Sequence, residues 1–166
     1  MISSCKKKEE AEPEAEISII GQSFNGGVVF YVDGTGQHGL VAAPSDQSTA
    51  VMWTGDTVKT AVTEYAVGVG QQNTTLIVGL KGAGNYAAWI CDQLVLNGYS
   101  DWYLPSRAEL KLLYEQRSLV GGFSNDYYWC STEFDDTKAW NIYFPYGPQY
   151  YANKTSLACV RAVRSF

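Results

Sequence analysis

The chain has 166 residues and a formal net charge of −5, without a basic stripe, so nucleic acid is disfavoured as a partner. Its four cysteines are too few for a disulfide scaffold, and no two of them have the spacing of metal ligands. The only histidine, His38, lies in a glycine-rich turn, which disfavours zinc binding and histidine-assisted nucleophilic catalysis. We therefore expect no metal, no cofactor and no enzymatic activity.

Residues 1–16 read MISSCKKKEEAEPEAE, and Ile2 to Cys5 match a bacterial lipobox, in which the cysteine becomes the lipidated N-terminus. The alternative is an incidental cysteine in a disordered tail. The residues after Cys5 show no apolar periodicity, so we expect a disordered tether. We expect this tail to hold the protein at the cell surface or outer membrane of a Gram-negative bacterium, through lipid alone. Residues 17–166 then form one domain, and no stretch approaches the roughly 18 apolar residues of a spanning helix.

The first predicted element is a β-hairpin. The runs 26–32 and 39–43 are apolar and flank a glycine-rich connection at 33–38. Further on, residues 68–73 resemble a phosphate-binding loop only superficially, because no Lys-Ser/Thr follows them. They fit better as a loop in which Asn73 or Thr74 caps a short helix.

Two helices are predicted next. Residues 85–96 place apolar side chains, including Cys91, on one broad face, and Asn97-Gly98 should end this helix. The second helix begins at Ser106, because Ser106 and Glu109 have the spacing of a capping box. A catalytic pairing of Glu109 with Glu115 is disfavoured, since their spacing does not place them on one face.

The C-terminal part is rich in aromatic residues and reads as three strand-like runs at 127–134, 139–144 and 158–166. In the middle run, alternation predicts that Trp140, Ile142 and Phe144 face the core, whereas Asn141 and Tyr143 are exposed. Residues 145–157 read as a surface loop. The last run should return beside the first strand and bring the termini together. The expected fold is α+β, with two helices, an N-terminal hairpin and C-terminal antiparallel strands.

The density of Tyr, Asn, Asp and Ser in this part is typical of a contact surface rather than a catalytic centre. We predict one exposed ligand-binding surface for an extracellular protein or glycan, built by Asp135, Asp136, Asn141, Tyr143, Tyr146, Tyr150, Tyr151 and Asn153. Cys130 and Cys159 both lie in the terminal strands, so they either form a disulfide or remain buried thiols.

Several blocks occur in the order found in the Lcl C-terminal domain family: GGVVFYVDGTGQHGLVAAP, NGYSDWYLPSRAEL, YYWCSTE, AW and VRAVRSF. The chain resembles this family from about Ile20 to Phe166. The resemblance implies a C-type lectin-like fold, in a bacterial branch whose members are commonly exported and lipid-anchored or attached to adhesins. Some members are implicated in binding polysaccharides.

The chain departs from this pattern at informative positions. Cys130 stands where the family usually has Ser, and Ala162 stands where some members have a cysteine that pairs with the position of Cys91, so that disulfide is absent. Trp140-Asn141-Ile142 lacks the aspartate of calcium-dependent sugar lectins, so we expect no calcium-dependent sugar binding.

Two narrower resemblances lie in the C-terminal block. It is similar to the variable region of proteins that are diversified by retroelements through mutation of adenines, although an ordinary loop-rich surface has much the same composition. The related formylglycine-generating enzymes share the LP-x-x-x-E element, but no motif around Cys130 and Cys159 matches their reactive cysteines. The sequence thus favours a ligand-binding surface lipoprotein. Its alternatives are a structural or adhesin assembly subunit and, least favoured, an enzyme.

Overall fold

The computed structural model describes residues 19–166. The predicted lipidation of Cys5, the tether at residues 1–16 and the domain boundary at residue 17 lie outside the described residues and stay predictions. The described chain is a mixed α+β structure with mostly strands and few helices, which confirms the expected fold class at this level. No helix within residues 19–166 is long and apolar enough to cross a membrane.

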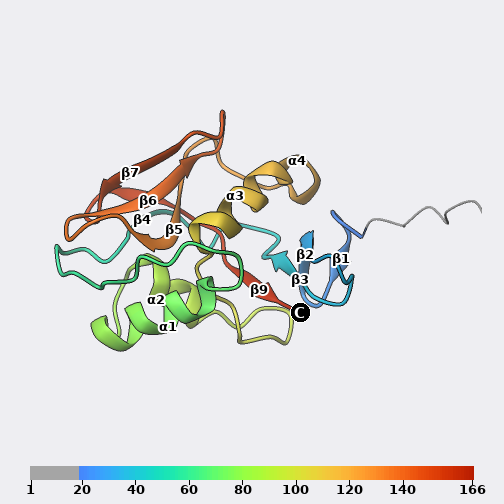
Figure 1. Cartoon of the computed structure of the whole chain (residues 1–166), viewed down its shortest axis with the longest axis horizontal. Coiled ribbons are helices and arrows are strands. Elements are labelled where there is room, and N and C mark those ends of the chain that lie inside the picture. Colours follow the sequence, from blue (N-terminus) through green and yellow to red (C-terminus); the bar gives the residue numbers. More distant parts are fainter. Residues whose placement is uncertain (1–18) are drawn as a thin grey trace, which may run out of the picture.

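The strands form two sheets. The N-terminal sheet has the order β1-β2-β3-β9, and the larger sheet has the order β4-β8-β5-β6-β7. Figure 1 shows the two sheets toward opposite ends of the molecule, with α1 and α2 on one side and α3 and α4 on the other. The strands are β1 (Ser23–Phe24), β2 (Gly27–Val32), β3 (Gly39–Ala42), β4 (Ser48–Met52), β5 (Tyr127–Glu133), β6 (Lys138–Tyr143), β7 (Gln149–Asn153), β8 (Leu157–Val160) and β9 (Val163–Ser165). The helices are α1 (Gly70–Lys81), α2 (Ala87–Asp92), α3 (Arg107–Glu115) and α4 (Arg117–Val120).

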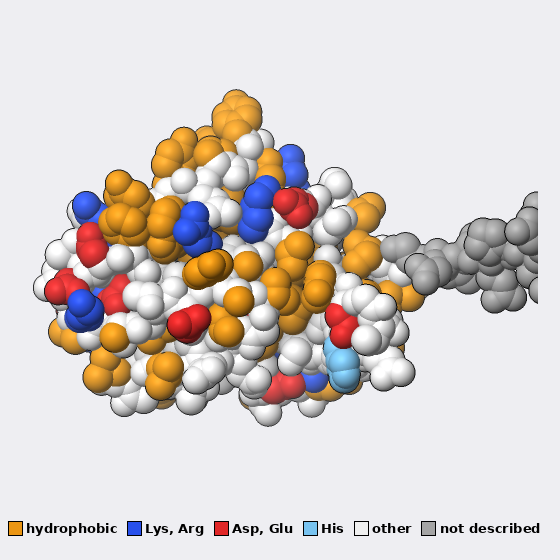
Figure 2. All heavy atoms as spheres, in the orientation of Figure 1, with side chains coloured by type: hydrophobic (Ala, Val, Ile, Leu, Met, Phe, Trp, Pro, Cys, Tyr) orange, Lys and Arg blue, Asp and Glu red, His pale blue; other side chains and the backbone are white. Residues whose placement is uncertain are grey.

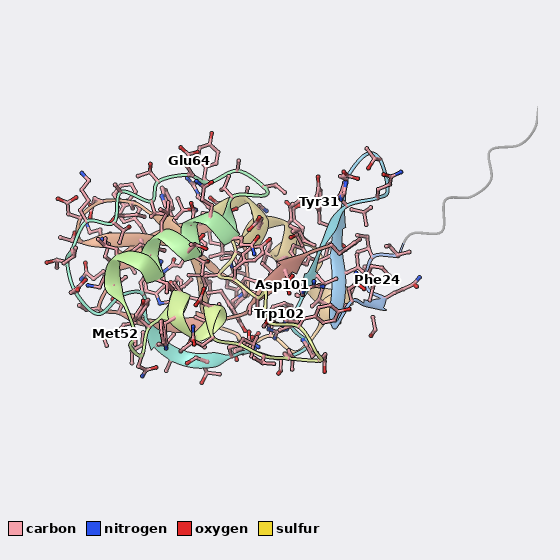
Figure 3. All side chains as sticks on the ribbon, turned by 90° about the horizontal axis from the view of Figure 1, so that it is seen from below. Phe24, Tyr31, Met52, Glu64, Asp101 and Trp102 are labelled. Carbon is pink, nitrogen blue, oxygen red and sulfur yellow. The ribbon has the colours of Figure 1, made fainter. Side chains whose placement is uncertain are left out.

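The predicted N-terminal hairpin is confirmed as β2 and β3. Gly39 is required at the start of β3, because a Cβ there would lie 2.3 Å from the carbonyl oxygen of Tyr31. The last strand, β9, pairs with β3 rather than with the first strand. The ends of the described chain still meet, since the rings of Phe24 and Phe166 are 4.9 Å apart. Figure 3 shows Phe24 and Met52 at opposite ends of the molecule.

The larger sheet differs from the predicted C-terminal set in three respects. The expected surface loop at 145–157 contains a full strand, β7. The last predicted run is divided between β8 and β9, which belong to different sheets. The strands are not all antiparallel, because β5 and β8 run parallel through the bridge between Tyr128 and Cys159.

The helix predicted from Ser106 is confirmed as α3, with a complete capping box. The Ser106 side chain accepts a hydrogen bond from the backbone N–H of Glu109, and the Glu109 carboxylate accepts one from the backbone N–H of Ser106, at 2.7 Å. The other predicted helix is shorter than expected, because α2 ends at Asp92. Asn97 and Gly98 have positive φ angles of 54° and 85° and form a tight turn between the bridged residues Leu96 and Tyr99, rather than a helix end.

The 12-residue helix α1 was expected only as a short helix after a glycine-rich loop. Its buried positions are Gly70, Asn73, Thr74 and Ile77, which are small or polar with one exception. The polar side chains among them bond to other segments of the chain: the Asn73 amide donates to the carbonyl oxygen of Glu64 at 2.7 Å, and the Thr74 hydroxyl accepts from the backbone N–H of Leu104 at 3.0 Å. The sequence of α1 therefore has no apolar stripe at helical spacing, although one face of the helix is buried.

The core consists of two apolar clusters. One includes Trp53, Ile77, Trp102 and Trp129, and the other includes Phe30, Leu110, Leu113, Tyr128 and Phe144. Cys91, Cys130 and Cys159 are buried free thiols, so the alternative disulfide between Cys130 and Cys159 is not formed. Burial raises the pKa of Cys159 to about 11 and that of Cys130 to about 12. Both thiols are therefore protonated at neutral pH, which makes them poor nucleophiles.

A buried ion pair between Lys154 and Glu133 attaches the long segment between β4 and α1 to the larger sheet. Both side chains are shielded from solvent. The Lys154 ammonium also donates to the carbonyl oxygens of Val58, at 2.8 Å, and Asp136, at 3.0 Å. The Glu133 carboxylate in turn accepts from the backbone N–H of Thr60 at 2.8 Å. One ion pair thus holds two backbone segments, the one between β4 and α1 and the turn between β5 and β6.

A second buried cation, Arg161, holds the junction between β8 and β9. Its Nε donates to the carboxylate of Asp46 at 2.7 Å. Its terminal nitrogens donate to the carbonyl oxygens of Ala43, at 3.0 Å, of Gly121, at 3.3 Å, and of Gly122. The guanidinium therefore connects the last strands to the end of β3 and to the segment after α4.

Candidate ligand-binding face

The register of β6 and β7 divides the predicted ligand-binding surface between two faces of the sheet. Asn141 lies opposite Tyr150, and Trp140 lies opposite Tyr151. Directly opposed residues of antiparallel strands point to the same face, and successive residues point to opposite faces. Tyr150 and Tyr151 therefore belong to different faces, and the prediction of one continuous surface is wrong.

Four tyrosines cluster on one of these faces, and we call them the tyrosine face: Tyr127, Tyr143, Tyr146 and Tyr150. The ring centroid of Tyr127 lies 4.7 Å from that of Tyr143 and 5.9 Å from that of Tyr150. The ring centroids of Tyr143 and Tyr146 are 5.8 Å apart. Tyr146 is 81% exposed and Tyr150 is 47% exposed. The sequence prediction missed Tyr127, whose position opposite Tyr143 depends on the pairing of β5 with β6.

The opposite face carries a second aromatic cluster, the Trp140 cluster, formed by Phe134, Trp140 and Tyr151. The rings of Phe134 and Tyr151 stack at 4.0 Å, and Trp140 meets both edge-on. The Arg107 guanidinium from α3 lies 3.5 Å from the centroid of the Trp140 ring. Ile142 and Phe144 are buried in the second apolar cluster, as predicted. Trp140 packs against that cluster but is only half-buried, beneath an arginine, so it lies at the edge of the core rather than inside it.

Asn141 is buried, which corrects its predicted exposure: it is only 3% exposed. Its neighbours across the sheet are Trp129 in β5 and Tyr150 in β7. The Oδ1 atom of its carboxamide has no hydrogen-bond partner among the described residues. Asn141 lines a cavity of about 330 Å³, here called the Asn141 cavity, together with Tyr127, Trp129, Tyr150, Tyr151, Ala152, Ser156 and Leu157.

The remaining predicted residues, Asp135, Asp136 and Asn153, lie at the other end of β6, which spans about 17 Å at roughly 3.3 Å per residue. Asp135 shapes the turn between β5 and β6, because its carboxylate accepts from the hydroxyl and the backbone N–H of Thr137, at 2.8 and 2.7 Å. These hydrogen bonds hold its pKa below the ordinary value. Asp136 forms a surface ion pair with Lys59 at 3.3 Å. The three residues are therefore not part of the tyrosine face.

A larger groove of about 660 Å³ lies beside α3, on the side of the Trp140 cluster. Its lining residues are Tyr31, Tyr65, Val67, Arg107, Ala108, Lys111, Leu112, Glu115 and Gln149. Figure 2 shows Lys and Arg side chains gathered over α3 between patches of hydrophobic side chains. No pattern in the sequence indicates this groove, because its walls come from four separate segments of the chain.

The carboxylate that the sequence placed in a capping box, Glu109, is buried and bound on several sides. Besides the backbone N–H of Ser106, it accepts from the backbone N–H of Gly68 at 2.8 Å. Burial raises the pKa of Glu109, and these hydrogen bonds oppose that effect. Its hydrogen bonds give it a structural role in joining α3 to the segment before α1. Within residues 19–166, no three His, Cys, Asp or Glu side chains are grouped so as to hold a metal ion.

Comparison with curated proteins finds no match. Among solved structures, the chain is similar to a fimbrial protein from Bacteroides ovatus ATCC 8483, with a TM-score of 0.57 and 16% sequence identity. The similarity covers 93% of this chain and 45% of the fimbrial protein, so the chain spans less than half the length of that structure. At this identity the likeness concerns the fold alone. The model of the Lcl C-terminal domain matches residues 43–164, and the chain therefore belongs to the Lcl C-terminal domain family.

Proposed function

We propose that the protein is a non-catalytic binding protein of the bacterial surface, which recognises an extracellular protein or glycan through the tyrosine face. The observation that carries this proposal is the contact cluster of Tyr127, Tyr143, Tyr146 and Tyr150 on one side of the sheet. Tyrosine rings offer large apolar area and a polar tip at low entropic cost, which is why they dominate recognition surfaces. A partner that covers these rings gains apolar burial without ordering flexible side chains.

The family membership and the likeness to a fimbrial protein support a location at the cell surface. A C-type lectin-like fold, which the sequence resemblance implies, is part of the same proposal. The same likeness favours a second candidate function, in which the domain is an assembly subunit of a larger surface structure. The tyrosine face would then pack against a neighbouring subunit. Purified protein that self-associates through Tyr143 and Tyr150 would favour this second function.

Retroelement-driven diversification of the tyrosine face is part of the proposal. Replacement of both adenines in an AAC codon can produce tyrosine, asparagine and aspartate but not lysine, glutamate or tryptophan. Between Cys130 and Cys159, the residues that such mutation cannot produce include Glu133 and Lys154, which form the buried ion pair. The accessible types include Tyr143, Tyr146 and Tyr150. A near-copy of the coding region that differs only at adenines, beside a reverse transcriptase gene, would test this idea.

Lipid anchoring should depend on Cys5 alone. If Cys5 is acylated, the full-length precursor expressed in a Gram-negative host partitions into the detergent phase and incorporates a palmitate analogue, because two or more acyl chains hold a protein stably in a membrane. Cys5→Ala should abolish both results. As a control, Cys91→Ala should leave partitioning and labelling unchanged. A wild-type precursor that stays unlabelled and soluble would contradict the anchor.

The double substitution Tyr143→Ala and Tyr150→Ala should abolish ligand capture on glycan and surface-protein arrays. Truncation of a hot-spot residue in an interface typically costs about 2 kcal/mol or more of binding free energy. The melting temperature should stay nearly unchanged, since Tyr150 is half exposed and Tyr143 is only partly buried.

The matched control is Tyr65→Ala, which removes an exposed tyrosine that belongs neither to the tyrosine face nor to the lining of the Asn141 cavity. This variant should capture ligand as the wild type does. Equal loss in this control and in the double variant would contradict a site on the tyrosine face, and so would unfolding of the Tyr143→Ala, Tyr150→Ala protein.

A further inference from the structure

We propose that the Asn141 cavity binds the ring of a neutral, hydroxyl-bearing sugar. This inference rests on the proposed function and narrows its ligand from an unspecified protein or glycan to an uncharged saccharide. Three properties of the cavity carry it: an amide oxygen without a hydrogen-bond partner in its wall, aromatic rings around it, and the charge of its lining.

The amide is the first property. Asn141 is 3% exposed and lines the cavity, and its Oδ1 atom has no partner among the described residues. A buried polar atom without a hydrogen bond costs free energy, and native structures satisfy nearly all such atoms. A hydroxyl group of a ligand in the cavity would donate to this oxygen. The site therefore favours a ligand that carries a hydrogen-bond donor at that position.

Aromatic and apolar side chains surround the amide. The rings of Tyr127 and Tyr150 meet edge-on across 5.9 Å, and Leu157 contributes apolar surface from the start of β8. Phenol rings combine an apolar face with a polar tip, and such surfaces fit a sugar ring, which presents C–H groups on its faces and hydroxyls at its edge. Ser156 adds a hydroxyl to the lining.

The charge and size of the cavity define the class of sugar. None of its lining side chains is charged. A carboxylate, sulfate or phosphate would lose its hydration here without gaining a cation, which is costly. Lys138 does approach Tyr151, 5.4 Å from the ring centroid, but it lies on the face of the Trp140 cluster. The volume of about 330 Å³ lies at the lower end of ligand cavities, which fits a single ring rather than a longer segment.

The test is a titration of the purified protein with methyl glycosides of neutral hexoses and N-acetylhexosamines, followed by saturation-transfer NMR and by amide chemical shifts. We expect at least one neutral glycoside to bind and to shift the amides of β5, β6 and β7. Asn141→Leu, which keeps the branched shape and the number of heavy atoms and removes the amide, should weaken binding by about tenfold. The melting temperature should stay equal or rise, because an unpaired buried polar group has been removed.

Two further variants make the test independent of how Asn141→Leu folds. Ala152→Leu adds a side chain from β7 in the lining and should block the cavity. Tyr65→Ala changes an exposed tyrosine that lies outside the tyrosine face and does not line the cavity, and it should bind the glycoside as the wild type does.

The outcomes separate this inference from the proposed function. If no neutral glycoside binds, or only sialylated or sulfated sugars or an unglycosylated peptide bind, the inference is overturned. The proposed function survives that result when array capture still depends on Tyr143 and Tyr150. Equal glycoside binding by wild type, Asn141→Leu and Ala152→Leu also overturns the inference, since the sugar then lies elsewhere. Loss of both glycoside binding and tyrosine-dependent capture overturns the two proposals together.

Discussion

Lys154→Met should lower the free energy of unfolding by about 3–5 kcal/mol, the range expected when one partner of a buried ion pair is removed. The substitution leaves the Glu133 carboxylate buried without its cation. It also deprives the carbonyl oxygens of Val58 and Asp136 of their donor. Urea denaturation followed by tryptophan fluorescence measures the change, because Trp53 lies 5.1 Å from the Lys154 ammonium.

Lys59→Met is the matched control. Lys59 pairs with Asp136 near the same turn, but the two side chains are 64% and 61% exposed, so this substitution should cost at most about 1 kcal/mol. The double variant Lys154→Met, Glu133→Leu should recover part of the lost stability, since it removes the unpaired charge. If Lys59→Met and Lys154→Met cost the same, the ion pair does not hold the β4–α1 segment.

Arg161→Met should be similarly severe, with an expected loss of about 3–5 kcal/mol. The guanidinium is fully buried and bonds to Asp46 and to three backbone carbonyl groups. Methionine fills much of the volume but donates no hydrogen bond, so Asp46 is left without its cation. Thermal and urea unfolding should both show the loss.

Arg161→Lys separates charge from geometry. Lysine keeps the positive charge, but its ammonium cannot reach carbonyl groups on several sides as the planar guanidinium does, so an intermediate loss is expected. A lysine variant as stable as the wild type would show that charge alone matters at this position. A methionine variant without measurable loss would contradict the structural role of Arg161.

The elements that the sequence predicted correctly are those encoded by neighbouring residues. The hairpin of β2 and β3 follows from two apolar runs around a glycine-rich turn, and α3 follows from the capping box of Ser106 and Glu109. The strands β5 and β6 were also predicted. Each of these signals depends on residues only a few positions apart, so no tertiary information was needed.

The elements that the sequence missed depend on distant contacts. The buried face of α1 uses Gly70, Asn73 and Thr74, which fit close to other segments but give no apolar period. The strand β7 contains two exposed tyrosines and has its place only because it pairs with β6. The final run changes sheets at Arg161, whose partners are 39 to 118 positions away in the sequence.

The candidate site was predicted in composition but not in geometry. The predicted alternation of buried and exposed residues along β6 requires that one face of the strand is buried and the other is solvated. In the structure both faces are partly covered, Trp140 by Arg107 and Asn141 by the neighbouring strands, so burial does not alternate. The pairing of Glu133 with Lys154 was not predicted, because 21 positions separate the two residues and no local pattern links them.

The pairing of β9 with β3, and the contact of Phe24 with Phe166, place both ends of the described chain beside the smaller sheet. The larger sheet lies toward the opposite end of the molecule (Figure 1). The two ends of the described chain therefore lie at the smaller sheet, whereas the tyrosine face belongs to the larger sheet. A segment joined to either end would be attached beside the smaller sheet and not at the tyrosine face.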